Sequence, residues 1–222
     1  MAIVPLPRRP LDPSDDPGAV PRDIACDIAC DIACDAVRRW YENDLGWATE
    51  PGTPVQLLTG LRFDVLDVPA EAGVAALRHL GPVPGPGSPV ALRGGRMLLL
   101  VAAGCAEELP GLLEWLDLGG LDLDLTAVGT GGHMVAPTPP GGAGRLVGGR
   151  GEAGSQGAAD WLRPPEPGCE VEPSLPSMSA LGGGGVAPDL VRVVDTVATH
   201  CHRVRLRRAS TGPSESQPLA FS

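Results

Sequence analysis

The sequence contains no lysine and few aromatic residues, and both scarcities limit what the chain can be. All 17 basic residues are arginine, a bias that GC-rich coding produces. Aromatic side chains make up 3% of the residues, so Leu, Val and Ala must build most of the core. No run of about 18 apolar residues occurs, so we expect no transmembrane helix, and the Pro-rich N-terminus lacks the pattern of a signal peptide.

An excess of basic charge is also missing. The formal net charge is −10, which argues against broad electrostatic capture of nucleic acid, because phosphate binding needs a basic surface. Six cysteines without a secretion signal indicate reduced thiols rather than a disulfide framework. We therefore expect a cytoplasmic protein with no membrane partner.

Glycine and proline, by contrast, are abundant: 31 and 25 of the 222 residues. This content indicates long irregular segments. From the positions of these segments we divide the chain into a disordered arm (1–21), an N-terminal helix (22–50), an ordered domain (53–165), a linker (166–188), an amphipathic helix (189–209) and a disordered tail (210–222).

The N-terminal helix contains an internal repeat, three copies of Asp-Ile-Ala-Cys at 23–34. Four residues rotate a helix by ~400°, so each copy shifts its face by only ~40° and the helix tolerates the insertion. Three interpretations remain open: slippage of a short coding repeat, ordinary buried thiols, or a zinc or redox site made by Cys26, Cys30 and Cys34. The last lacks the usual Cys-x2-Cys spacing and a His partner.

Hydrophobic periodicity predicts an α+β fold with a mixed or antiparallel sheet and helices on one face. The predicted order is strand, strand, helix, repeated once and followed by a closing hairpin. The strands are expected at 55–59, 63–68, 89–92, 97–102, 121–128 and 133–136, and the helices at 69–80 and 107–117. Residues 161–165 are expected to pack back onto the sheet. The helix at 189–209, with Asp189 as its N-cap and an Arg-rich last part, is a candidate docking element for a protein partner.

Three segments of the ordered domain carry residues suited to chemistry. They are LRFDVLDVP at 61–69, RGGRMLLL at 93–100, and LDL at 123–125 with GGHMVAP at 131–137. Their order and spacing resemble the N-terminal domain of bifunctional DNA primase/polymerases of the archaeo-eukaryotic primase type. The resemblance covers roughly residues 53–165.

The resemblance implies that Asp67 and Asp124 are metal ligands, with Mg²⁺ as the cofactor, and that Gly94, Gly95 and Arg96 bind a nucleotide. Two positions depart from the family pattern. Pro69 stands where the family has a second metal-binding Asp, and Met97 stands where it has a His. No catalytic residue is therefore assigned beyond Asp67 and Asp124 as remnants.

The residues themselves allow more than one interpretation of the proposed metal and nucleotide sites. Asp64 faces the opposite side of a regular strand from Asp67, so it cannot easily complete a metal site. Asp67 with Asp124 suits one weakly bound Mg²⁺, or both are solvated carboxylates at strand ends. Gly94 and Gly95 suit a phosphate-binding turn or a simple hairpin turn.

Histidines add little to the candidate site. His133 is expected to be structural. His200, Cys201 and His202 cannot all bind one ion, because adjacent helical residues point ~100° apart.

The leading functional expectation is a primase/polymerase-like protein that has lost catalysis and binds a nucleotide, nucleic acid or a protein partner. The first alternative is a regulatory or interaction protein that uses the sheet only as a scaffold, and the second is an active Mg²⁺-dependent primase/polymerase. The arrangement of Arg62, Arg78, Arg93 and Arg96 discriminates between them. Clustering in one groove favours phosphate binding, whereas scatter favours partner docking.

Overall fold

The computed structural model describes residues 22–82, 87–141, 158–178 and 189–210. The predicted arm at 1–21, residues 179–188 of the predicted linker and residues 211–222 of the predicted tail lie outside the described residues. Among the described residues, no helix combines the length and the apolar character needed to cross a membrane.

The fold is α+β, as predicted, and every pairing between its named strands is antiparallel. A central five-stranded sheet has the order β6-β3-β5-β4-β8. Its strands are β3 (Phe63–Pro69), β4 (Val90–Arg93), β5 (Arg96–Ala102), β6 (Thr126–Val128) and β8 (Ala159–Arg163). A smaller sheet has the order β1-β2-β7 and contains β1 (Thr49–Glu50), β2 (Gln56–Leu58) and β7 (His133–Val135).

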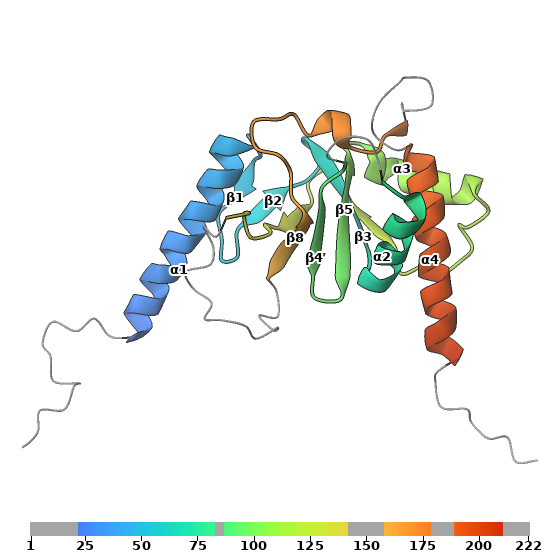
Figure 1. Cartoon of the computed structure of the whole chain (residues 1–222), viewed down its shortest axis with the longest axis horizontal. Helices are drawn as coiled ribbons and strands as arrows, with labels where there is room; N and C mark the ends of the chain where they lie inside the picture. Colours follow the sequence, from blue (N-terminus) through green and yellow to red (C-terminus); the bar gives the residue numbers. More distant parts are fainter. Residues whose placement is uncertain (1–21, 83–86, 142–157, 179–188, 211–222) are drawn as a thin grey trace, which may run out of the picture.

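Three helices, α2 (Ala70–Leu80), α3 (Cys105–Trp115) and α4 (Leu190–Ser210), pack into the core on one face of the central sheet. Strand alternation explains this face, since Leu66 and Val68 of β3 point to the same side as Met97 and Leu99 of β5. Figure 1 shows α2 and α4 side by side at this end of the molecule. The apolar stripe of α4 is buried as predicted, and the Val191 N–H donates to Asp189 Oδ1 at 3.1 Å.

The opposite face of the sheet is covered by most of the few aromatic residues. They come from η1 (Trp40–Asp44), the loop after it, β3 and β8, and are Trp40, Tyr41, Trp47, Phe63 and Trp161. The Tyr41 hydroxyl donates to the Pro137 carbonyl at 2.6 Å and accepts from the Trp161 indole N–H at 3.0 Å. Packing and hydrogen bonds of these few aromatic side chains therefore hold the N-terminal segment and β8 against the sheet.

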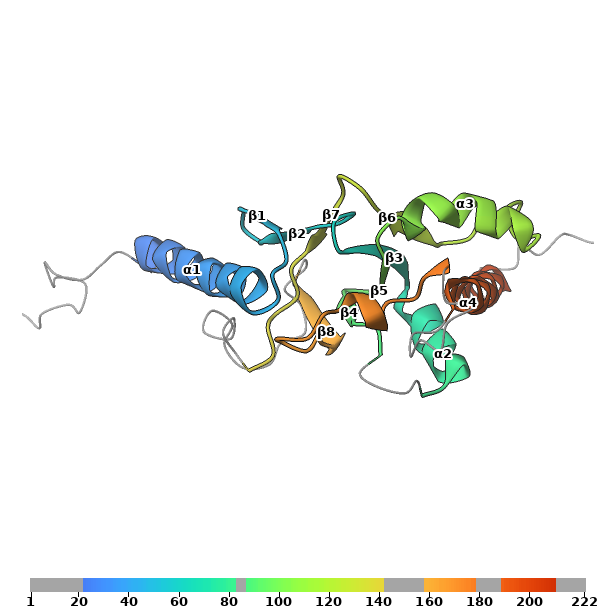
Figure 2. The same ribbon diagram turned by 90° about the horizontal axis from the view of Figure 1, so that it is seen from above.

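The predicted helix at 22–50 is shorter in the structure. Helix α1 (Arg22–Arg39) runs into the π-helical turn η1, and residues 45–50 form a loop and β1. Figure 2, seen from above, shows α1 extending away from the two sheets.

Two further predictions on the ordered domain are wrong. Only Thr126–Val128 of the expected strand at 121–128 pairs with the sheet. The expected closing hairpin does not form, because β6 pairs with β3 whereas β7 pairs with β2 in the other sheet. Residues 161–165 do return to the central sheet as expected, through β8.

Candidate functional site

Three of the residues singled out in the sequence meet at one end of the central sheet. Asp67 lies near the end of β3, and Arg96 opens β5 directly opposite Pro69. Asp124 comes two residues before β6, the strand that flanks β3 on its other side. Neighbouring strands lie about 4.8 Å apart, so the three side chains are within reach of one another.

One guanidinium holds both carboxylates. Arg96 Nε donates to Asp67 Oδ1 at 2.6 Å, and Nη1 donates to Asp124 Oδ1 at 2.5 Å. Nη2 donates to the backbone carbonyl of Asp67 at 3.0 Å. The Arg96 and Asp67 side chains are each about a third exposed, and Asp124 is half exposed. Arg96 therefore bridges the two carboxylates that the sequence suggested as metal ligands.

The electrostatics of Arg96 agree with this geometry. Partial burial by itself lowers the pKa of the guanidinium, but hydrogen bonds and Coulomb attraction from Asp67 and Asp124 outweigh it and raise the pKa. Arg208 of α4 adds a second, longer ion pair with Asp124, at 3.8 Å. Fixed arginine charges thus neutralise this carboxylate cluster.

The residues do not fit a resident Mg²⁺ while Arg96 is in place. Mg²⁺ needs oxygen ligands at 2.0–2.1 Å in an octahedron, yet guanidinium nitrogens contact one oxygen of each carboxylate. In the described parts of the chain, no three His, Cys, Asp or Glu side chains come together as potential metal ligands. Asp67 and Asp124 meet as expected, but around an arginine.

The turn at Arg93-Gly94-Gly95-Arg96 is a tight hairpin between β4 and β5. Gly94 has a φ of +56°, which an L side chain rarely adopts, and this explains the glycine. The Gly95 carbonyl accepts from the Ala70 N–H at 2.8 Å, so the turn is tied to the first residue of α2. The Arg96 side chain points toward the two carboxylates, so the turn serves to join β4 to β5 and to anchor α2.

Met97 belongs to the core. Its side chain is fully buried and lies on the helix-covered face of β5, whereas Arg96 precedes it on the other side of the strand. A Cβ placed on Gly73 of α2 would lie 2.3 Å from Met97 Sδ, so glycine lets the helix pack directly onto this sulfur. The residue at this position therefore has no access to a ligand beside Arg96.

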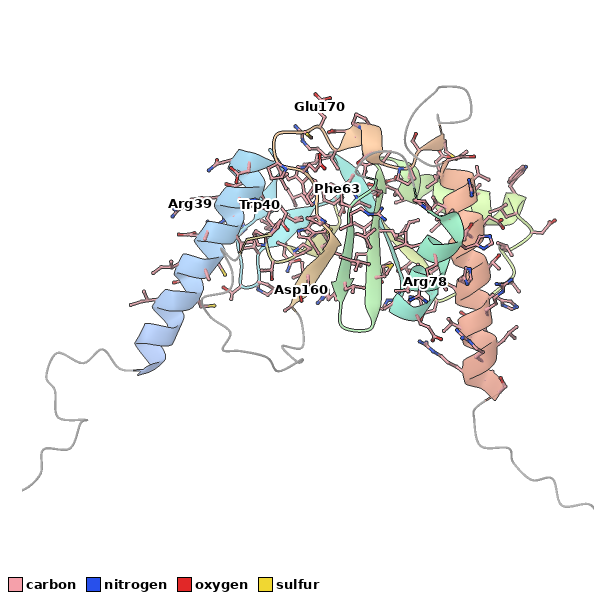
Figure 3. All side chains as sticks on the ribbon, in the orientation of Figure 1. Arg39, Trp40, Phe63, Arg78, Asp160 and Glu170 are labelled. Atoms are coloured by element: carbon pink, nitrogen blue, oxygen red, sulfur yellow. The ribbon has the colours of Figure 1, made fainter. Side chains whose placement is uncertain are left out.

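The four arginines chosen as a discriminator do not gather in one place, although Arg93 and Arg96 are cross-strand neighbours in the same hairpin. Arg62 precedes β3 and pairs with Glu172 at 2.8 Å, at the opposite end of the strand from Arg96. Arg78 lies near the C-terminal end of α2, beside a cavity that Arg207 also lines, and Figure 3 labels its position. Arg93 is exposed in the hairpin. They do not form one phosphate-binding groove.

The histidines and the α4 cysteine also have structural environments. His133 Nε2 lies 2.7 Å from Glu50 Oε2, which joins β7 and β1. Cys201 points into the core, and burial raises the pKa of its thiol to about 11. The His200 ring makes an edge-on contact with the His79 ring of α2, with the ring centroids 6.0 Å apart.

Sequence reasoning missed the role of Asp64. This side chain is fully buried, and its Oδ2 accepts the Ala106 N–H at 2.9 Å, in the first turn of α3. Burial raises the pKa of Asp64, and backbone hydrogen bonds partly oppose this. The available sequence signal is that Gly104, the residue before α3, provides no side-chain cap, so a cap has to come from elsewhere in the fold.

Comparison with known proteins finds no similar protein. No family model, no curated protein and no solved structure matches this chain. Its function therefore has to be inferred from the geometry of these residues.

Proposed function

We propose that this protein is a primase/polymerase-like domain that has lost catalysis and works in the cytoplasm as a protein-interaction module. The observation that carries the proposal is the Arg96 guanidinium between Asp67 and Asp124. The resemblance of the three sequence segments supplies the family, and the arginine supplies the reason for inactivity.

Nucleotidyl transfer needs carboxylates that hold exchangeable divalent cations, which activate the attacking hydroxyl and neutralise the triphosphate. A guanidinium supplies positive charge, but it has no open coordination position and does not lower the pKa of a bound hydroxyl. In this arrangement Arg96 takes over the electrostatic part of the metal's task, holding β3 and the segment before β6 together. The chemical part has no replacement among these residues.

A nucleic-acid or nucleotide ligand is less well supported than a protein partner. The chain is acidic overall, with a net charge of −10, and Arg62 and Arg96 are engaged with carboxylates. Apolar exposure favours a protein partner: Trp115 is 72% exposed and lines a hollow of about 290 Å³ with Gly111 and Met178.

A partner that docks on the helix at 189–209 can reach only part of the helix surface. The apolar stripe of α4 is buried against α2 and the sheet. Its outer side and its arginine-rich end remain at the surface, with Leu206 55% exposed.

The test is a thermal-shift titration with ATP, GTP and the four dNTPs, each with and without Mg²⁺ or Mn²⁺. It uses the wild type, Arg96→Ala, and Arg93→Ala as a control from the same turn. We expect no metal-dependent nucleotide effect on the wild-type melting temperature. A metal-dependent rise that Arg96→Ala abolishes and Arg93→Ala keeps would contradict the proposal and favour a working nucleotide site.

A further inference from the structure

Trp115 lines a surface groove between α3 and the start of α4. The groove is a hollow of about 290 Å³. Its lining comes from one side of α3, from the chain between β8 and α4, and from the first turn of α4: Glu108, Gly111, Leu112, Trp115, Met178 and Val191. Figures 1 and 2, two perpendicular views, both show α3 beside α4 at one end of the molecule.

The Trp115 side chain differs from the other tryptophans of this chain. It is 72% exposed, whereas the other three pack in the aromatic cluster on the far face of the central sheet. Tryptophan is highly buried on average in folded proteins and is enriched at protein interfaces. An exposed indole that lines a groove is therefore suited to stack on a group that enters from outside.

Gly111 keeps the middle of the groove open. Glycine weakens a helix relative to alanine, yet a Cβ placed on Gly111 would meet no atom within 4 Å. Packing among the described residues therefore does not call for this glycine, in contrast to Gly73, which Met97 approaches closely. Close approach of a partner to the helix backbone does call for one.

The groove offers negative charge at one end and an aromatic ring at the other. Glu108 and Trp115 are seven residues apart, so they lie on the same side of α3, about 10 Å apart along its axis, with Gly111 between them. Among the described residues, Glu108 forms no ion pair. Residues 105–118 contain four carboxylates and no basic side chain, and Arg192, next to Val191, does not line the hollow.

We propose that this groove binds an arginine side chain from a basic segment of another protein, an inference that rests on the proposed function and names the chemistry of the partner. The guanidinium lies over Gly111, pairs with Glu108 and stacks on Trp115. Midway between these two residues it is about 5 Å along the axis from each, within the ~6 Å at which an aromatic ring attracts a cation. The methylene stem packs on the apolar lining.

Arginine fits this arrangement better than lysine. Its planar guanidinium pairs bidentately with a carboxylate and stacks on an aromatic ring, whereas an ammonium is a strongly hydrated point charge. The net charge of −10 also favours approach of a basic partner.

Other occupants fit the charge of the groove less well. The ten residues that join Met178 to Asp189 contain no basic residue, so they provide no counter-ion for Glu108. The arginine-rich end of α4 in a second copy is a poor occupant, because Arg205, Arg207 and Arg208 are paired with carboxylates of their own chain.

The experiment titrates the full-length protein with a tri-arginine peptide blocked at both ends and follows tryptophan fluorescence. Tri-lysine and tri-glutamate peptides of the same design serve as comparisons. The peptides span roughly 10 µM to 3 mM, because one side-chain pocket binds weakly, in about 0.15 M salt, which screens distant charges. We expect saturable binding of tri-arginine, several-fold weaker binding of tri-lysine and no binding of tri-glutamate.

A matched pair of variants separates the groove from the general charge of α3. Glu108→Gln should raise the dissociation constant of tri-arginine by about five- to tenfold. Glu114→Gln removes the same charge from the same helix, but Glu114 packs toward Gly119 and does not line the hollow, so the constant should change less than about twofold. Trp115→Ala, followed by calorimetry, should weaken binding about as much as Glu108→Gln.

Gly111→Ala separates binding from folding. Its Cβ meets no atom in the free protein, so the melting temperature should rise by a few degrees. Its methyl group occupies the place of closest approach, so tri-arginine should bind at least about tenfold more weakly. A damaged fold cannot give both results.

The proposal is overturned if the wild type does not bind tri-arginine, if Glu114→Gln weakens binding as much as Glu108→Gln, or if Gly111→Ala binds like the wild type. A wild type that dimerises and is dissociated by the peptide would identify a second copy as the occupant and would also overturn it. None of these results bears on whether the Asp67–Arg96–Asp124 cluster is inactive, because the nucleotide titration tests that function separately.

Discussion

Replacing Arg96 by Ala is the perturbation that separates a guanidinium bridge from an accidental surface contact. The change removes two ion pairs and a hydrogen bond to the Asp67 carbonyl, and it leaves two carboxylates facing each other. Exposed ion pairs contribute about 0.2–1 kcal/mol each. The pair with Asp67 is more protected, and its loss leaves half-buried acceptors unsatisfied. We expect the free energy of unfolding to fall by about 2 kcal/mol, measured by urea denaturation.

Divalent cations should compensate for this loss in the variant only. Once the guanidinium is gone, Asp67 and Asp124 form a weak cation site, with a dissociation constant on the order of 1 mM. At 10 mM Mn²⁺ such a site restores about 1.4 kcal/mol by mass action. The wild type should show no such gain, because Arg96 already neutralises both carboxylates.

Arg93→Ala serves as the control, since Arg93 is an exposed residue of the same hairpin, and its removal should change stability by less than about 0.5 kcal/mol. The reasoning fails if Arg96→Ala is as stable as Arg93→Ala, or if Mn²⁺ stabilises the wild type and Arg96→Ala equally.

Three further changes test the rest of the fold. Tyr41→Phe removes the hydrogen bonds to Pro137 and Trp161 and should lower the free energy of unfolding by about 2 kcal/mol in urea denaturation. Burial raises the pKa of the Asp64 carboxyl in the folded protein. The protonated carboxyl therefore stabilises the folded state at low pH. This stabilisation should be lost as the pH rises from the unfolded-state pKa of about 3.9 through the raised folded-state pKa. Denaturation of Asp64→Asn over the same pH range should lack this component. Gly60→Ala places a Cβ 2.3 Å from a backbone atom of Thr130 at a φ of +84°, and its melting temperature should fall by several degrees.

The regular elements could be predicted because their patterns are local. Mainly apolar runs next to glycine turns define β3 and β5 to within a residue, and helical spacing defines α2 and α4. The strand expected at 121–128 shows where such patterns mislead. Its alternating Leu and Asp residues are typical of a half-buried strand, yet Asp122 and Asp124 are held by Arg205 and Arg96 outside the sheet.

The meeting of Asp67, Arg96 and Asp124 was predictable in part. The sequence places Asp67 and Arg96 near the ends of predicted strands and Asp124 within the strand predicted at 121–128, and the resemblance groups them. It does not reveal that Arg96 is the counter-ion, because this depends on the β3–β5 register that sets Arg96 opposite Pro69. Periodicity fixes which residues of a strand share a face, but it does not say which strands pair, so the β3–β5 pairing and the placement of β6 and β7 in different sheets could not be read from it.

The most direct test of the central claim is nucleotide incorporation by the full-length wild type. Labelled dNTPs and rNTPs are supplied with primed and unprimed single-stranded DNA, in Mg²⁺ and in Mn²⁺, beside Asp67→Asn/Asp124→Asn as the blank. Our account predicts that the wild type makes no more product than this variant. Template-dependent product from the wild type that disappears in Asp67→Asn/Asp124→Asn would show that Arg96 yields its place to a catalytic metal, and would contradict the account.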